Sequence, residues 1–203
     1  LARVHREPQV TPIETHISHV LIAGDTAYKI KKPLRLPFVD YSTLARRRHF
    51  CEEELRLNRR LAPGLYRDVV AITGSLDAPR LDGDGPALEY AVRMRAFAQD
   101  ALLSECLARG DLGASRIDEL ARIVASFHAS LAGAPEHSPY GTPAHALADA
   151  LENFAAIAPV VAVERRDVVA RLRDWTLAEF RRCSAAMAQR RRDGRVRECH
   201  GDL

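Results

Sequence analysis

The spacing of apolar residues changes once along this chain, and that change limits the fold more than any other feature. Residues 10–95 carry mostly the alternating or β-branched runs typical of strands, with a tight turn at residues 23–26. From residue 99 onward, apolar side chains recur at the three- and four-residue intervals of amphipathic helices. The sequence therefore predicts an α+β protein in which a β-rich part, residues 1–94, precedes a helical part, residues 95–203.

One helix interrupts the strands. Ser42 is its expected N-cap and Pro63 its expected end, and two strands follow it, "YRDVVAIT" and "PALEYAVRM". In the helical part, the longest helices are expected over residues 143–157 and 162–192. We expect the buried side of the second to hold six large side chains, Val168, Leu172, Trp175, Phe180, Cys183 and Met187. A cleft between two such parts is a preferred position for a ligand site.

Composition disfavours several classes of function. The 203 residues carry a formal net charge of +3 at pH 7, too small to indicate a nucleic-acid partner. The arginine clusters at residues 46–48 and 190–192 have neighbouring acids or lie at a helix end, so we expect them on solvated faces. The four cysteines lack CxxC spacing, and no apolar run reaches the length of a membrane span. We therefore expect a cytoplasmic protein with reduced thiols and no membrane contact.

Two stretches carry residues suited to phosphoryl transfer, which needs a cation for the phosphates and an acid that holds the cation in place. The cation is Lys29 in "TAYKIKK", and its partner is a glutamate of "CEEELRLNRR" on the next helix. Successive helical residues are turned about 100° apart, so at most one or two of the three glutamates can face the lysine. Glu54 is favoured because it lies on the same side of the helix as Asn58 and Leu61, and Glu52 is the reserve. The alternative is an exposed strand lysine beside Lys31 and Lys32, next to a solvated acidic patch that pairs with nearby arginines.

A third candidate is Asp202 in the closing "HGDL", where a loop aspartate beside His200 could accept or orient a hydroxyl proton. The tetrapeptide alone is weak evidence. Two rival sites are disfavoured, because His128 lacks a second metal ligand at helical spacing and because the adjacent Cys199 and His200 point to opposite faces of a strand. No metal site is predicted within the 203 residues.

Taken in order, these pieces resemble the aminoglycoside phosphotransferase family, whose fold is protein-kinase-like. The resemblance is carried by Lys29 on a strand, Glu54 on the next helix, the strand entering "RMRAF", and "HGDL" after the helices. The stretch from "ETHISHVLIAGDTAYKIKKP" to "RRLAPGLY" is similar to a narrower bacterial group whose full chains often carry a downstream P-loop ATP-binding domain. The resemblance implies a two-lobe fold, with an N-lobe over residues 1–94 and a helical C-lobe, residues 95–203, truncated after the start of the catalytic loop.

The resemblance also implies catalytic roles. Lys29 would pair the phosphates of ATP, Glu54 would hold Lys29, and Asp202 would be the catalytic aspartate. In this family an asparagine five residues after the loop aspartate and a later aspartate hold Mg²⁺, so the metal ligands are expected beyond residue 203. The 203 residues alone are therefore expected to bind nucleotide weakly and to catalyse nothing.

The same resemblance implies an ATP site between the lobes. Ser18 would lie in the turn over the phosphates, and main-chain groups of Met94, Arg95 and Ala96 would receive the adenine. The expected function is ATP-dependent transfer of the γ-phosphoryl group to a hydroxyl of a small molecule, whose identity the sequence does not indicate. The alternative is a catalytically inactive kinase-like module that serves binding or regulation in a larger ATPase-containing protein.

Overall fold

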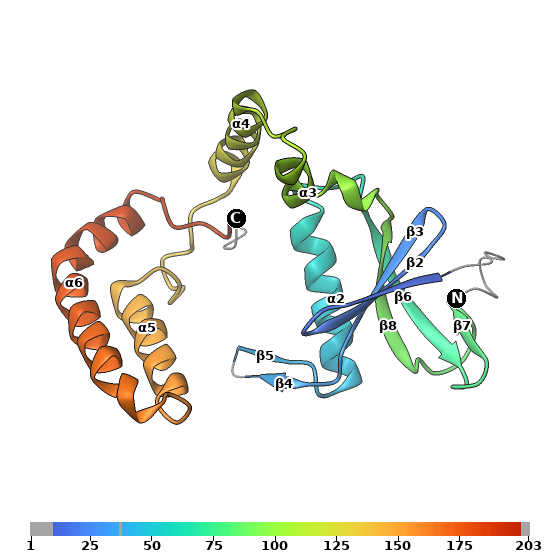
Figure 1. Cartoon of the computed structure of the whole chain (residues 1–203), viewed down its shortest axis with the longest axis horizontal. Helices are drawn as coiled ribbons and strands as arrows, with labels where there is room; N and C mark the ends of the chain where they lie inside the picture. The colour runs from blue at the N-terminus through green and yellow to red at the C-terminus, as the bar shows by residue number, and fades with distance from the viewer. Residues whose placement is uncertain (1–9, 37, 200–203) are drawn as a thin grey trace. The chain divides into compact units, whose positions relative to one another are not determined.

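The computed structural model describes residues 10–36 and 38–199 (Figure 1). The chain divides into two compact units, Leu1–Ile117 and Asp118–Leu203, and each is described by itself. The first unit contains an antiparallel sheet with helices, whereas the described regular elements of the second are helical. This confirms the α+β class and the order of its parts. The predicted lobe boundary at residue 94 lies next to the end of β8 (Glu89–Arg95), and its role as a hinge stays a prediction.

The main sheet of the first unit has six strands in the described residues, in the order β1-β2-β3-β8-β6-β7. Every neighbouring pair is antiparallel. In this order β3 and β8 are the two central strands, although they are far apart in sequence. A separate ribbon of two short strands, β4 and β5, precedes the helix α2. The remaining bounds are β1 Val10–Glu14, β2 Ser18–Ala23, β3 Thr26–Lys31, β4 Arg35–Leu36, β5 Val39–Asp40, α2 Leu44–Asn58, β6 Tyr66–Gly74, β7 Pro79–Leu81, η1 Gln99–Ala101 and α3 Leu103–Ala108.

The predicted turn between β2 and β3 is confirmed. Ala23 pairs with Thr26, so only Gly24 and Asp25 connect the two strands. Gly24 has a φ of +58°, a left-handed conformation that costs a glycine little. The Thr26 hydroxyl donates to the Asp25 carboxylate at 2.8 Å, which stabilises the turn further. This tight hairpin sets the register that places Ser18 opposite Lys31.

The helix α2 begins one residue later than predicted. Thr43, not Ser42, is the N-cap, and its side chain accepts the N–H of Arg46. Ser42 instead donates its backbone N–H and its hydroxyl to Asp40 Oδ1, at 3.0 and 2.6 Å. Both residue types cap helices well, so local preference could not separate them. The helix ends at Asn58, before the predicted Pro63.

The two faces of the sheet are covered differently. On one face Tyr28, Val70 and Ala91 form a buried apolar cluster, with Ile30, Ile72 and Leu81 packed against it. On the other face α2 packs along β8 and β6 (Figure 1). There the Cys51 side chain is fully buried, and its Sγ lies 3.9 Å from the carbonyl oxygen of Tyr90. Because side chains alternate along β3, Lys29 and Lys31 lie on the face that α2 covers.

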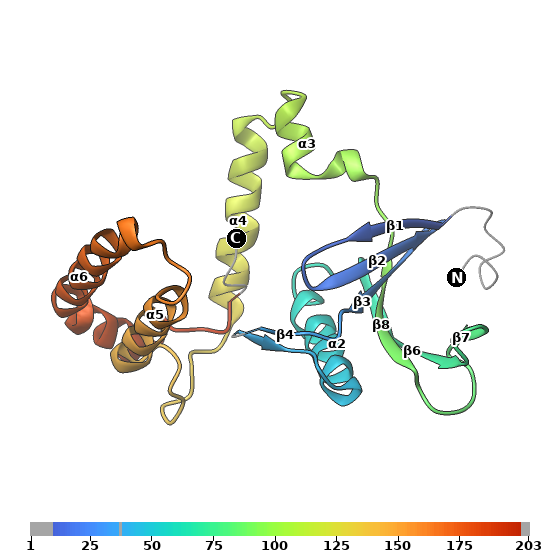
Figure 2. The same ribbon diagram turned by 60° about the horizontal axis from the view of Figure 1, so that its bottom comes forward.

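The second unit is built around the helices α5 (Pro143–Ile157) and α6 (Arg166–Arg192), which lie side by side in Figure 1 and Figure 2. Both predicted helices are confirmed. The short helix η2 (Val163–Arg165) forms the first turn of the helix predicted over residues 162–192. The predicted buried side of α6 is wrong in part, because Leu172 and Trp175 are 52% and 64% exposed. Val168, Phe180, Cys183 and Met187 are half-buried, and the residues of α6 near α5 also include Val169, Ala170 and Arg173. The helix α4 (Ala114–Ser130) crosses the division between the units.

Arg191 organises the connection between α4 and α5. Its guanidinium donates to the carbonyl oxygens of Pro135 and Glu136 at 3.1 and 2.9 Å, and also to those of Ser138 and Tyr140. Arg191 is half-buried, so the expected solvated face at residues 190–192 includes a residue that also binds the chain itself. A planar guanidinium with five donors can satisfy several carbonyls of an irregular segment at once.

Neither a membrane span nor a metal cluster is found in the part of the chain that the structure describes. No described helix combines the length and the apolar character that crossing a bilayer requires. Within the same residues, no group of three or more His, Cys, Asp and Glu side chains is arranged to hold a metal ion.

Candidate functional site

The central feature of the first unit is an ion pair between β3 and α2. Lys29 Nζ donates to Glu54 Oε1 at 2.8 Å, across 25 positions of sequence. The Glu54 side chain is 11% exposed, whereas that of Lys29 is 29% exposed. The Glu54 side chain is therefore largely withdrawn from water, whereas that of Lys29 remains partly exposed.

The three consecutive glutamates of α2 take three different roles. Glu52 accepts from Arg48 at 2.8 Å and Glu53 from Arg56 at 2.8 Å, both on the solvated side of the helix. Only Glu54 turns toward the sheet, which settles the choice between Glu54 and Glu52 that the sequence left open. The alternative of a solvated acidic patch that pairs with nearby arginines therefore describes Glu52 and Glu53, but not Glu54.

Lys31 is the residue of this cluster that the sequence analysis did not single out. Its Nζ donates to Glu54 Oε2 at 2.7 Å, so one carboxylate binds two lysines. The Lys31 side chain is only 4% exposed, and Nζ lies 5.0 Å from the centroid of the Tyr41 ring. The alternative took Lys29 as an exposed lysine of a basic strand; Lys29 is half-buried in its ion pair, and Lys31 beside it is buried. The signal was present in the alternation of β3, which places Lys29 and Lys31 on one face.

Burial and neighbouring charges shift the pKa values of Glu54 and Lys31 in opposite directions. Burial alone raises the pKa of Glu54, but the positive charges of Lys31 and Lys29 outweigh it and hold that pKa below its ordinary value. Burial alone lowers the pKa of Lys31, yet the charge of Glu54 and its hydrogen bond raise the pKa above the ordinary value. Burial raises the pKa of the neighbouring Cys51 thiol to about 11. At neutral pH two ammonium groups thus share one carboxylate beside an uncharged thiol.

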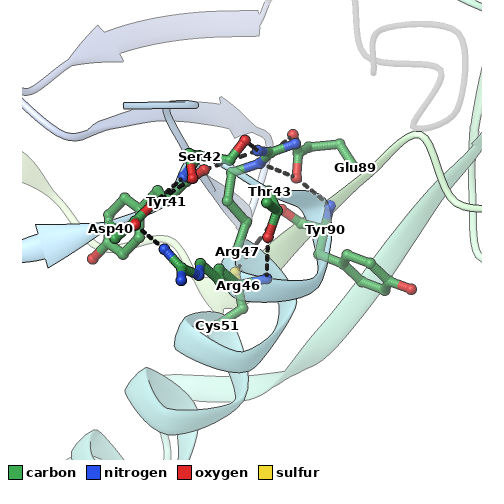
Figure 3. A network of polar contacts seen from close by, with 9 residues as sticks. All are labelled: Asp40, Tyr41, Ser42, Thr43, Arg46, Arg47, Cys51, Glu89 and Tyr90. Carbon is green, nitrogen blue, oxygen red and sulfur yellow. Dashed lines mark hydrogen bonds and ion pairs between the residues drawn. The ribbon is translucent and has the colours of Figure 1, made fainter. Parts of the chain in front are cut away.

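A second polar network fixes the N-terminal end of α2 (Figure 3). Arg47 is only 8% exposed, and its Nε lies 3.0 and 2.8 Å from the two carboxylate oxygens of Glu89 on β8. Its Nη1 donates to the carbonyl oxygen of Tyr41 at 2.9 Å. Arg47 therefore ties α2 both to the sheet and to the segment that carries the Tyr41 ring. The expectation that residues 46–48 lie on a solvated face is wrong for Arg47, whose partners lie elsewhere in the chain.

Ser18, expected over the phosphates of a nucleotide, is the first residue of β2 and is fully buried. It lies directly opposite Lys31, and cross-strand partners share a face of the sheet. Its hydroxyl oxygen has no hydrogen-bond partner among the described residues. Beside it, an open hollow of about 530 Å³ is lined by Glu14, Thr15, His16 and Lys32. The expected turn over the phosphates, residues 15–18, thus borders a hollow with a lysine on its rim.

The residues expected to receive adenine lie at the end of β8. Met94 pairs with Ala27 across β3. The N–H of Arg95 donates to the carbonyl oxygen of Leu65 at 2.8 Å, and the N–H of Ala96 donates to that of Asp25 at 2.7 Å. These two donors are used within the chain. The next amide, that of Phe97, has no hydrogen-bond partner in the described part of the chain.

Asp202, His200 and the rest of "HGDL" lie outside the described residues. The structure therefore brings together Lys29 and Glu54. Ser18 and Met94 lie on β2 and β8, the two strands that flank β3. The role of Asp202 stays a prediction. His128, which the sequence analysis disfavoured as a metal ligand, has a buried Nε2 without a hydrogen-bond partner among the described residues.

Comparisons with known proteins identify relatives but no family. No protein-family model matches the chain. Curated relatives include uncharacterized proteins of Mycobacterium tuberculosis (strain ATCC 25618 / H37Rv) and Mycobacterium bovis, each 32% identical over 122 residues. The match covers 60% of this chain and 23% of each relative, so this chain spans only about a quarter of their length. No solved structure matches significantly.

Proposed function

We propose that this chain forms the nucleotide-binding part of an ATP-dependent phosphotransferase of the aminoglycoside phosphotransferase-like family, with a protein-kinase-like two-lobe fold. The observation that carries the proposal is the ion pair between Lys29, on the third strand, and Glu54, on the helix that follows it. In protein kinases, a lysine on the third strand pairs with a glutamate of the following helix and contacts the nucleotide phosphates. The reaction would transfer the γ-phosphoryl group to a hydroxyl of a small molecule.

The chemistry of the cluster supports a polyanionic ligand. Lys29 and Lys31 together carry one more positive charge than Glu54 balances, and the more accessible of the two ammonium groups is that of Lys29. Lys29 would bind phosphate oxygens, and Glu54 would hold its side chain in the extended position that reaches them. ATP supplies the phosphoryl group, and Mg²⁺ supplies positive charge to its phosphates. Asp202 would orient the acceptor hydroxyl as the catalytic aspartate.

The adenine would bind at the end of β8. Because the N–H groups of Arg95 and Ala96 donate within the chain, the base would use the Phe97 N–H and the carbonyl oxygens of this segment. Such main-chain pairing recognises the edge of a base without requiring a particular side chain at each position.

The same engaged donors favour the second candidate, a kinase-like module that binds nucleotide or a partner without catalysis. Two N–H groups that are already paired leave the adenine site with fewer donors. The two candidates differ in turnover, because only the enzyme transfers a phosphoryl group when an acceptor is present.

The test compares variants of neighbouring residues in the intact protein. Lys29→Ala should weaken ATP binding at least about tenfold, because a charge-assisted hydrogen bond contributes roughly 1.5–3 kcal/mol. Lys29→Ala should also abolish ATP turnover in the presence of a panel of hydroxylated acceptors. Glu52→Gln is the matched control, since Glu52 lies on the same helix but pairs with Arg48 on the solvated side. Equal ATP binding by wild type and Lys29→Ala would refute the proposal, and binding without any turnover would favour the inactive module.

A further inference from the structure

The two oxygens of the Glu54 carboxylate are divided between an accessible and an inaccessible lysine. Oε1 accepts from Lys29 at 2.8 Å and Oε2 from Lys31 at 2.7 Å. The Lys31 side chain is 4% exposed, compared with 29% for Lys29. A ligand can therefore reach the side chain of Lys29, whereas that of Lys31 is covered.

Lys31 is held in place by more than the carboxylate. Its Nζ lies over the Tyr41 ring, and the Tyr41 carbonyl oxygen accepts from the buried Arg47, which also binds Glu89 on β8. The segment that covers Lys31 is therefore anchored to both α2 and the sheet. Nothing comparable holds Lys29, whose one partner among the described residues is Glu54.

A lysine that was the sole partner of a buried glutamate would have to divide its three N–H donors between both carboxylate oxygens and a phosphate group. A carboxylate that loses its cation in a poorly solvated site is strongly destabilised, so a lone glutamate would compete with the ligand for Lys29. A second, permanent cation on the other oxygen removes this conflict. Oε2 then stays paired with Lys31, and Lys29 keeps its contact with Oε1 while its remaining N–H donors turn toward the ligand.

We propose that Lys31 is a positioning residue of the nucleotide site: it neutralises Glu54 permanently, so that Lys29 can bind phosphate while the buried carboxylate keeps a partner. This inference rests on the proposed nucleotide-binding function. It assigns different tasks to two lysines of one strand, the exposed one to the ligand and the buried one to the glutamate. The excess positive charge of the cluster is thereby presented at Lys29.

The test measures binding of ATP and of adenosine to the intact protein by calorimetry. Lys31→Met should weaken ATP binding on the order of tenfold, because Glu54 then competes for Lys29. Adenosine binding should stay unchanged, since adenosine has no phosphate to contact Lys29. If the role of Lys31 were merely structural, Lys31→Met would weaken the binding of ATP and of adenosine alike. That result would overturn the inference.

Two further variants keep the test decisive if Lys31→Met folds poorly. The double variant Lys31→Met, Glu54→Gln removes the buried charge together with its partner, and it should bind ATP as Glu54→Gln alone does. Lys31→Arg retains the cation and should bind ATP within about threefold of wild type. An ATP affinity unchanged in Lys31→Met overturns the inference alone, whereas a wild-type protein that binds neither ligand overturns the proposed function and this inference with it.

Discussion

Glu54→Gln tests the role of the shared carboxylate in stability. The substitution conserves the size of the side chain and removes the charge that Lys29 and Lys31 share. Removing one partner of a buried ion pair typically costs about 3–5 kcal/mol, against at most about 1 kcal/mol for an exposed pair. With Lys31 at 4% and Glu54 at 11% exposure, the buried case applies. We expect the free energy of unfolding to fall by about 3 kcal/mol. This is the lower end of the range for a buried pair, because glutamine can still accept one hydrogen bond.

The stability that Glu54→Gln loses relative to wild type should depend on pH in a defined direction. The pKa of Glu54 is lower in the folded protein than its ordinary value of 4.5. Its contribution to stability is therefore present above pH 4.5 and is lost as the pH falls through the folded-state pKa. The pKa of Lys31 lies above its ordinary value of 10.5, so its contribution is lost only as the pH rises beyond that value. The difference between wild type and Glu54→Gln should thus be constant from about pH 5 to pH 10 and shrink in acid.

The assay must separate the two units. Hydrogen exchange of peptides from β3 and α2, followed in increasing urea, reports on the first unit. Fluorescence of Trp175, the single tryptophan, reports on α6 in the second unit and should not change. Glu52→Gln is the control and should alter stability by less than about 0.5 kcal/mol, because Glu52 and Arg48 are 49% and 57% exposed. The reasoning is refuted if Glu54→Gln and Glu52→Gln change exchange in β3 equally.

Two further predictions concern other parts of the molecule. Cys51 is fully buried and its thiol has a pKa of about 11. Iodoacetamide at pH 8 should therefore modify Cys199 in the folded protein well before Cys51. Equal labelling of both cysteines, measured by mass spectrometry, would contradict the burial of Cys51. Gly141 has a φ of +70°, and a Cβ there would lie 2.3 Å from Val196 Cγ1. Gly141→Ala should therefore destabilise the second unit by about 2 kcal/mol in urea unfolding followed by Trp175 fluorescence, and Val196→Ala should recover part of the loss.

Local pattern predicted much of the architecture and part of the site. The alternation in "TAYKIKK" placed Lys29 and Lys31 on one face of a strand, and the order of residues pointed to a glutamate on the following helix. The same reasoning failed in part for α6, where Leu172 and Trp175 are exposed although the other four predicted residues are half-buried. A helical period states which residues share a face, but which face is buried depends on the neighbouring element.

The sequence also missed contacts of charged residues whose partners are distant in the chain. Arg47 appeared to belong to a solvated cluster, yet it is buried because Glu89, 42 positions away, binds its guanidinium. Arg191 likewise lies in a basic run but binds carbonyl groups more than 50 positions away. No local signal marks such residues, since burial of a charge requires a partner that only folding supplies.

The sequence by itself determined the α+β class, the order of strands and helices, and the identity of Lys29 and Glu54 as candidates, because these follow from short-range periodicity and residue chemistry. Only the tertiary structure decided that Glu54, and neither of its two neighbours, faces the sheet, and that it binds Lys31 as well as Lys29. The rotation of α2 about its axis settles both points. That rotation is set by the packing of Cys51 and the anchoring of Arg47 against β8, which no local pattern contains.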